Sequence, residues 1–126
     1  MEDLAWTARE QAYAPYSGYR VGAVLQAADG RIFTGSNVEN AAYGDSVCAE
    51  RVAVWKAVSE GVRRFRELIV VAEGPLPVPC GSCRQVLAEF APDLAIRVRN
   101  RSEGREYRLG ELLPAPFQLE SGPDGS

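Results

Sequence analysis

The spacing of apolar residues along the chain predicts three helices and five short strands. Apolar residues recur every three or four positions in three stretches, and shorter alternating or continuous apolar runs lie between those stretches. Turn signals at Asp29-Gly30 and Glu103-Gly104 separate the first two strands and the last two. The predicted helices cover residues 3–12, 46–60 and 81–91, and the predicted strands cover residues 21–25, 31–36, 67–72, 95–99 and 106–109.

The second predicted helix carries reactive side chains at its start. Val47, Val54 and Val58 would form one apolar stripe along it. Cys48 and Glu50 stand in its first turn. A carboxylate there is ordinarily explained by the partial positive charge of a helix N-terminus. That charge does not explain why a thiol lies two residues away.

The order of the elements predicts an α/β fold. Helices alternate with strands in a way that suits a three-layer α/β/α arrangement around a central mixed sheet of about five strands. The chain has 126 residues, of which 46% are hydrophobic, and this suits one compact domain. We expect a single domain over residues 1–119 and a disordered tail over residues 120–126, because the tail has little apolar surface to bury.

Charge and N-terminal sequence argue against nucleic acid and membrane partners. The net charge is −3, whereas binding to a phosphate backbone needs clustered positive charge. The arginines within residues 63–66 are interpreted as a solvated turn. The N-terminus lacks the basic and apolar regions of a secretory signal, and no run of eighteen apolar residues occurs. We therefore expect a cytoplasmic protein whose partner is a small molecule.

The three cysteines and the absence of histidine restrict the possible chemistry. An odd number of cysteines argues against a disulfide framework. Cys80 and Cys83 lie at the start of one predicted helix, and Cys48 lies at the start of another. Helix N-termini favour thiolates because they carry partial positive charge. If the two helix ends converge, the three thiolates form a set that suits zinc.

Three protein ligands indicate a catalytic zinc rather than a structural one. A structural site is closed by four protein ligands, whereas a catalytic site keeps one position open. Zinc lowers the pKa of a bound water to about 7. Glu50 could carry protons beside such a metal without ligating it, and general acid–base catalysis of this kind contributes about 10²–10⁴ in rate.

Each feature alone has a simpler explanation. The pentapeptide PCGSC could be a thiol–disulfide pair, or its cysteines could be inert packing. A lone glutamate in a first helical turn usually complements the helix dipole. The combination of Cys-Ala-Glu with Pro-Cys-x-x-Cys is more specific, because it matches the signature of zinc-dependent nucleobase deaminases, which accept three cysteines as ligands.

Nearly the whole chain resembles the cytidine deaminases of the small homotetrameric type with three zinc-binding cysteines. The resemblance implies one zinc per chain and a homotetramer with active sites shared between subunits. It also implies hydrolytic deamination of cytidine and deoxycytidine to uridine and deoxyuridine with release of ammonia, a reaction of pyrimidine salvage. The matching stretches are AYAPYSGYRVGAVL, GSNVENAAYG, VCAERVAVWKAVSEG, PCGSCRQVLAEF and ELLPAPF.

The resemblance assigns expected roles around the metal. Cys48, Cys80 and Cys83 would hold the zinc. Glu50 would act as the proton shuttle, and Arg51 would hydrogen-bond the ligating thiolates. These roles imply that Glu50 takes a proton from the attacking water and delivers protons to N3 and to the leaving amino group of the pyrimidine.

The resemblance also assigns substrate contacts. Asn37 and Glu39 match a ribose-binding pair, and an amide with a carboxylate suits a sugar hydroxyl. The backbone around Ala49 would read the base edge. Phe117 and Tyr43 match aromatic residues that a neighbouring subunit brings to the base and the sugar. Without the resemblance, the NVEN stretch would be an ordinary loop and Phe117 would be core packing.

Three positions depart from the family pattern. Tyr19 stands where Phe is usual and adds a hydroxyl beside the nucleoside pocket, where it is expected among the substrate contacts. Asp45 replaces the more usual Thr or Ser, and Trp55 is bulkier than most residues at its position. These departures concern the substrate range rather than the reaction class.

Two other functions remain open from the sequence. One is a deaminase of another cytosine nucleoside, such as an antibiotic resembling blasticidin S, because that family shares both cysteine motifs. The other, from a different class, is a structural zinc module or a thiol redox protein. A fourth protein ligand, or a disulfide between Cys80 and Cys83 without metal, would support this second reading.

Overall fold

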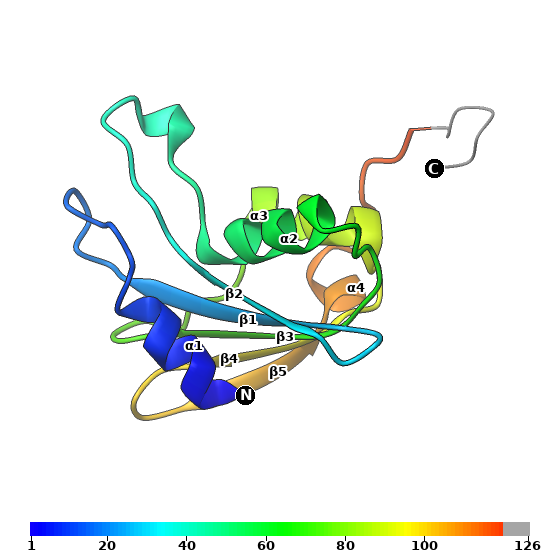
Figure 1. The fold of residues 1–126 in the computed structure, drawn as a ribbon, viewed down its shortest axis with the longest axis horizontal. Helices are drawn as coiled ribbons and strands as arrows, with labels where there is room; N and C mark the ends of the chain where they lie inside the picture. The colour runs from blue at the N-terminus through cyan, green and yellow to red at the C-terminus, as the bar shows by residue number, and fades with distance from the viewer. Residues whose placement is uncertain (120–126) are drawn as a thin grey trace.

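A computed structural model describes residues 1–119, whose five strands form one mixed sheet (Figure 1). The spatial order of the strands is β2-β1-β3-β4-β5. β3 and β4 are parallel, and the other three neighbouring pairs are antiparallel. The strands are β1 (Val21–Ala27), β2 (Ile32–Ser36), β3 (Phe65–Ala72), β4 (Ala95–Arg99) and β5 (Gly104–Arg108).

In the described part of the chain, four helices and one 3-10 turn accompany the sheet. They are α1 (Glu2–Arg9), η1 (Tyr43–Asp45), α2 (Ala49–Ser59), α3 (Gly81–Phe90) and α4 (Leu109–Leu112). Within residues 1–119, no helix combines the length and the hydropathy that a membrane crossing requires. The tail expected over residues 120–126 lies outside the described residues.

Helices cover both faces of the sheet, and the predicted α/β class is confirmed (Figure 1). In β3, Leu68 and Val70 pack with the larger core beneath α2 and α3, whereas Ile69 and Val71 pack with Ala5 of α1. A strand that is buried on both faces reads as a continuous apolar run instead of an alternating one. This explains why the sequence of β3 contains the unbroken run LIVVA.

Every predicted helix and strand is present, with ends that differ by at most three residues. The largest differences have a common cause in the loops beside the sheet. Val38 forms isolated β-bridges with both Tyr13 and Val47. These bridges draw the chain away from α1 after Arg9 and delay the start of α2 until after Cys48.

The apolar stripe expected on α2 is therefore partly wrong. Val47 lies before the helix and pairs with a neighbouring loop, and Val58 is only partly buried. Val54 is buried as expected. The buried face of the helix consists of small residues, Val54 and one carboxylate: Ala49, Glu50, Ala53, Val54 and Ala57.

The strand directions bring the N-termini of α2 and α3 to one edge of the sheet. β2 and β3 are both antiparallel to β1, which lies between them, so they run in the same direction. Their C-terminal ends consequently meet the same edge. α2 follows β2 and α3 follows β3, and each helix starts from that edge and packs back over the sheet (Figure 1).

Two glycines let the helices approach the sheet closely. A Cβ atom on Gly35 of β2 would lie 2.7 Å from the amide nitrogen of Ala53 in α2. A Cβ atom on Gly22 of β1 would lie 2.7 Å from the amide nitrogen of Arg9 in α1. Both distances are too short for a real side chain, so a larger residue would push the helix outward.

The close contact at Gly35 generates a testable expectation. Gly35→Ala should lower the free energy of unfolding by about 1–3 kcal/mol, because the added methyl group overpacks the junction between β2 and α2. The measurement is the urea midpoint at fixed protein concentration. Gly110→Ala is the matched control, because its Cβ would lie an ordinary 3.8 Å from the Pro92 carbonyl oxygen. An equal effect of the two substitutions would contradict the account of this contact.

Candidate functional site

The three cysteine sulfurs meet where α2 and α3 begin. Cys48 is the N-cap residue of α2, Cys80 is the N-cap residue of α3, and Cys83 lies in the first turn of α3. The Sγ atoms of Cys48 and Cys80 are 3.7 Å apart, and those of Cys80 and Cys83 are 3.4 Å apart. All three sulfurs lie within 4.8 Å of one another. The predicted convergence of two helix ends is thus present.

This spacing fits one tetrahedral zinc ion. Ligands that lie about 2.3 Å from zinc at tetrahedral angles are separated by about 3.8 Å. The sulfur separations of 3.7 and 3.4 Å are close to that value. All three cysteines are free thiols, so each can supply a thiolate. The cluster can therefore hold zinc by three protein ligands, which is the number found in catalytic sites.

The surroundings of the cluster stabilise negative charge. Arg51 places Nη2 3.6 Å from the Sγ atom of Cys48. The hydrogen bond with Cys83 lowers the pKa of Cys48 to about 5, and the hydrogen bond from Arg51 adds to this effect. The same bond with Cys48, together with burial, raises the pKa of Cys83. The thiolate of Cys48 is therefore favoured, whereas a thiolate at Cys83 needs added positive charge beside it.

Glu50 is the buried carboxylate of the site. Glu50 is 4% exposed and lies in the first turn of α2, next to Arg51. Burial, followed by the charge on Cys48, raises the pKa of Glu50 to about 7. A carboxyl group with a pKa near neutrality is suited to accept and release a proton. This property distinguishes Glu50 from a solvated glutamate that only complements the helix dipole.

A cavity of about 860 Å³ opens beside the cysteine cluster. Its lining includes Cys48, Cys80, Glu50 and Arg51, and its size is in the range of small-molecule sites. Five of the six residues expected to contact substrate also line this cavity: Tyr19, Asn37, Glu39, Tyr43 and Ala49. The structure therefore brings together most of the predicted site.

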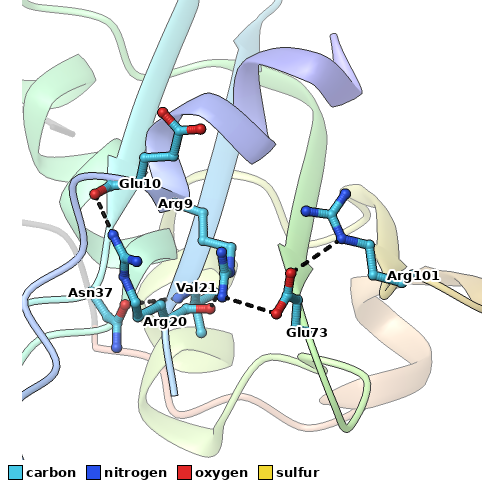
Figure 2. A network of polar contacts seen from close by, with 7 residues as sticks. All are labelled: Arg9, Glu10, Arg20, Val21, Asn37, Glu73 and Arg101. Carbon is cyan, nitrogen blue, oxygen red and sulfur yellow. Dashed lines mark hydrogen bonds and ion pairs between the residues drawn. The ribbon is translucent and has the colours of Figure 1, made fainter. Parts of the chain in front are cut away.

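Asn37 is held rigidly at the wall of the cavity. Its Oδ1 accepts a hydrogen bond of 2.8 Å from the Val21 amide, and its Nδ2 donates one of 2.8 Å to the Tyr19 carbonyl. Figure 2 shows that this contact adjoins a wider polar network. There Arg9 donates to the Arg20 carbonyl at 3.1 Å and pairs with Glu73 at 3.6 Å.

The network in Figure 2 contains residues that the sequence reasoning missed. Arg9 joins the end of α1 to the backbone just before β1, and Glu73 lies just after β3. Glu73 also pairs with Arg101 at 3.3 Å. No local sequence pattern marks these ion pairs, because their partners come from different elements. Arg9 binds the carbonyl of Arg20, which lies between the two residues whose backbone Asn37 binds.

Glu39 organises the loop at the rim of the cavity. Its carboxylate accepts hydrogen bonds from the amides of Tyr16 and Ser17, at 3.0 and 3.1 Å, and a further one from the Ser17 hydroxyl. The bonds from Ser17 lower the pKa of Glu39 and keep it ionised. The carboxylate thus ties the PYSGY loop to the NVEN loop, and its expected ribose contact stays a prediction.

The hydroxyl of Tyr19 is hydrogen-bonded within the chain. It donates a hydrogen bond of 2.6 Å to the Pro75 carbonyl in the proline-rich loop before Cys80. Burial and then the charge of Glu50 raise the pKa of Tyr19, so the hydroxyl keeps its proton. The two other departures lie elsewhere: within residues 1–119, neither Asp45 nor Trp55 lines the cavity.

The two aromatic residues expected to serve a neighbouring subunit are exposed. Tyr43 is 88% exposed in η1, at the rim of the cavity. Phe117 is 69% exposed and, among the described residues, does not belong to the lining of its own chain's cavity. Both side chains are free to meet another chain, and their roles stay predictions.

Comparison with known proteins gives a consistent result. Residues 1–97 match the family model described as the cytidine and deoxycytidylate deaminase zinc-binding region. The chain is 51% identical to the cytidine deaminase of Sporosarcina psychrophila over 116 aligned residues. The alignment covers 90% of this chain and 85% of that protein. A second relative, the cytidine deaminase of Halalkalibacterium halodurans, is 48% identical over 120 residues, which cover 93% of this chain and 91% of that protein.

Solved structures agree with these matches. The crystal structure of the cytidine deaminase from Burkholderia pseudomallei superposes with a TM-score of 0.87 at 45% identity, covering 91% of this chain and 94% of that one. The expected zinc cofactor is confirmed, because the matched region is a zinc-binding region and contains the cluster of Cys48, Cys80 and Cys83. In sequence, in fold and in its cysteine cluster, the chain belongs to the cytidine and deoxycytidylate deaminase family.

Proposed function

We propose that this protein hydrolyses cytidine and deoxycytidine to uridine and deoxyuridine with release of ammonia. The observation that carries the proposal is the joint placement of the buried Glu50 and two members of the cysteine cluster, Cys48 and Cys80, on one cavity. Relatives that share about half of its residues are named cytidine deaminases. The NVEN, PYSGY and ELLPAPF segments favour a nucleoside with an unmodified ribose or deoxyribose.

The cysteines and Arg51 prepare the site for its metal. Cys48, Cys80 and Cys83 hold the zinc, and the guanidinium beside Cys48 offsets part of the charge of three thiolates. When bound, zinc supplies Lewis-acid chemistry, which makes a water acidic enough to yield hydroxide at neutral pH. The starts of α2 and α3 add partial positive charge at the same place.

Glu50 moves the protons of the reaction. Water adds to C4 of the pyrimidine, and the bond between C4 and the exocyclic nitrogen breaks. Glu50 accepts one proton from the attacking water and delivers it to N3, and then accepts the second proton from the new C4 hydroxyl and delivers it to the departing amino nitrogen, which leaves as ammonia. A carboxyl group whose pKa is about 7 can perform both halves of this cycle near neutral pH.

The walls of the cavity orient the nucleoside. The backbone around Ala49 faces the base edge, and the fixed amide of Asn37 and the carboxylate of Glu39 face the sugar. Asn37 Oδ1 and Glu39 Oε2 each accept one protein hydrogen bond and keep a second lone pair, and Asn37 Nδ2 keeps a second N–H. The Tyr19 ring contributes a wall, while its hydroxyl holds the Pro75 loop.

A homotetramer in the cytoplasm completes the proposal. Phe117 and Tyr43 extend from the chain without burying their rings, and a neighbouring subunit's cavity would cover them. Three free cysteines suit a reducing compartment, where thiols persist. In this arrangement each active site takes its metal and proton carrier from one chain and its aromatic cover from another.

The proton-carrier role predicts a specific loss in Glu50→Gln. The amide keeps the size of the side chain but cannot exchange protons, so kcat for cytidine should fall by at least about 10²–10⁴. Zinc content and the thermal midpoint should stay close to those of the unaltered protein. The assay is ammonia release by the metal-analysed protein with cytidine, deoxycytidine, cytosine, CMP and blasticidin S.

Glu60→Gln provides the matched control, because Glu60 is an exposed residue at the other end of α2. It should leave turnover unchanged. Loss of zinc in Glu50→Gln would instead make Glu50 a ligand and the site structural. Near-full turnover would remove Glu50 from the reaction altogether.

Sharing of active sites predicts complementation between two defective chains. Phe117→Ala should raise KM and keep zinc, and Glu50→Gln should keep Phe117 but lose turnover. Mixed tetramers made by co-expression contain sites that combine Glu50 of one chain with Phe117 of the other. Such tetramers should regain activity at low substrate concentration, measured against the two variants purified apart. An absence of rescue in verified mixed tetramers would show that Phe117 acts within its own chain.

A further inference from the structure

The segment after α4 is attached to α3 by the side chain of Gln85. The Gln85 Nε2 donates a hydrogen bond of 2.9 Å to the Phe117 carbonyl. Its Oε1 accepts one of 3.1 Å from the Phe117 amide. The amide nitrogen and the amide oxygen of one side chain thus both hydrogen-bond the backbone of a single residue, 32 positions away in sequence.

Arg84, the preceding residue, makes a second attachment. Its Nε donates a hydrogen bond of 2.7 Å to the carbonyl of Pro79, the residue before Cys80. Its Nη1 donates one of 3.0 Å to the carbonyl of Leu112, the last residue of α4. One guanidinium therefore ties the end of α4 to the loop that delivers a zinc-binding cysteine.

Beyond α4 the segment depends on Gln85. Within the described part of the chain, residues 114–119 make no hydrogen bonds other than the two to Gln85. The Phe117 ring is 69% exposed, so burial within its own chain does not fix it either. The backbone of this residue is held in place while its aromatic side chain is left open to solvent.

We propose that Gln85 is a positioning residue that presents Phe117 to the active site of a neighbouring subunit. A fixed backbone restricts where the exposed ring can point, so the ring reaches its partner with less conformational entropy to lose. The inference rests on the proposed function, in which Phe117 covers a neighbour's substrate. It adds that α3 serves two active sites, since it carries Cys83 for its own and holds Phe117 for the next.

The proposal is tested with Gln85→Leu, which removes both hydrogen bonds and keeps a side chain of similar size. Hydrogen exchange of the Phe117 amide should accelerate by about tenfold or more, because this amide loses its acceptor on Gln85. KM for cytidine should rise by about tenfold, with kcat and zinc content unchanged. Gln85→Glu keeps the acceptor for the Phe117 amide but loses the donor, so it should give intermediate values.

Two further variants make the result specific. Glu89→Leu removes a polar side chain from an exposed position one turn farther along α3, and it should change neither exchange nor KM. Combining Gln85→Leu with Phe117→Ala should raise KM no further than Phe117→Ala alone, because Gln85 acts only through Phe117.

The outcomes separate the inference from the function on which it rests. If Phe117→Ala raises KM but Gln85→Leu changes neither KM nor exchange, the positioning role is wrong and the role of Phe117 stands. If exchange accelerates in Gln85→Leu while neither variant changes KM, Gln85 holds the segment but Phe117 does not serve the substrate, and the proposal is overturned. A fall in kcat or in zinc content in Gln85→Leu would assign Gln85 to the metal site instead.

Discussion

Three thiolates and a carboxylate repel one another, so they can lie close together in a protein only where nearby positive charge offsets this repulsion. Here that charge comes from the starts of two helices and from Arg51, whose Nη2 lies 3.6 Å from Cys48. The strand directions make this possible. Because β2 and β3 both run antiparallel to the β1 between them, α2 and α3 begin at the same edge of the sheet. The cysteine cluster, the buried Glu50 and the cavity all follow from that convergence.

The rest of the chain holds this site in place. Gly35 lets α2 lie close to the sheet, and its buried face of mostly small residues keeps Glu50 away from solvent. The loops around the cavity are secured by polar contacts between distant segments. Asn37 fixes the backbone before β1, and Glu39 fixes the PYSGY loop. Specificity for a nucleoside would then depend on side chains whose positions are set by hydrogen bonds rather than by the apolar core.

Much of the fold and the centre of the site could be predicted from the sequence, because both leave local patterns. Apolar periodicity located the five strands and the helices α1, α2 and α3 but not the short α4, and Cys48, Cys80 and Cys83 stand beside recognisable helix starts. The polar supports leave no such pattern. The hydroxyl of Tyr19 meets Pro75 across 56 residues of sequence, and Gln85 meets Phe117 across 32. The start of α2 was misplaced for the same reason, since the bridge between Val38 and Val47 is not encoded locally.

The central claim is that three cysteines hold a zinc beside a carboxylate that is not a ligand. The most direct test is zinc X-ray absorption on the purified protein and on Glu50→Gln, combined with zinc analysis. One zinc per chain with three sulfur neighbours at about 2.3 Å is expected in both proteins. A zinc with fewer than three sulfur neighbours, or an environment that changes when Glu50 is replaced, would contradict that claim.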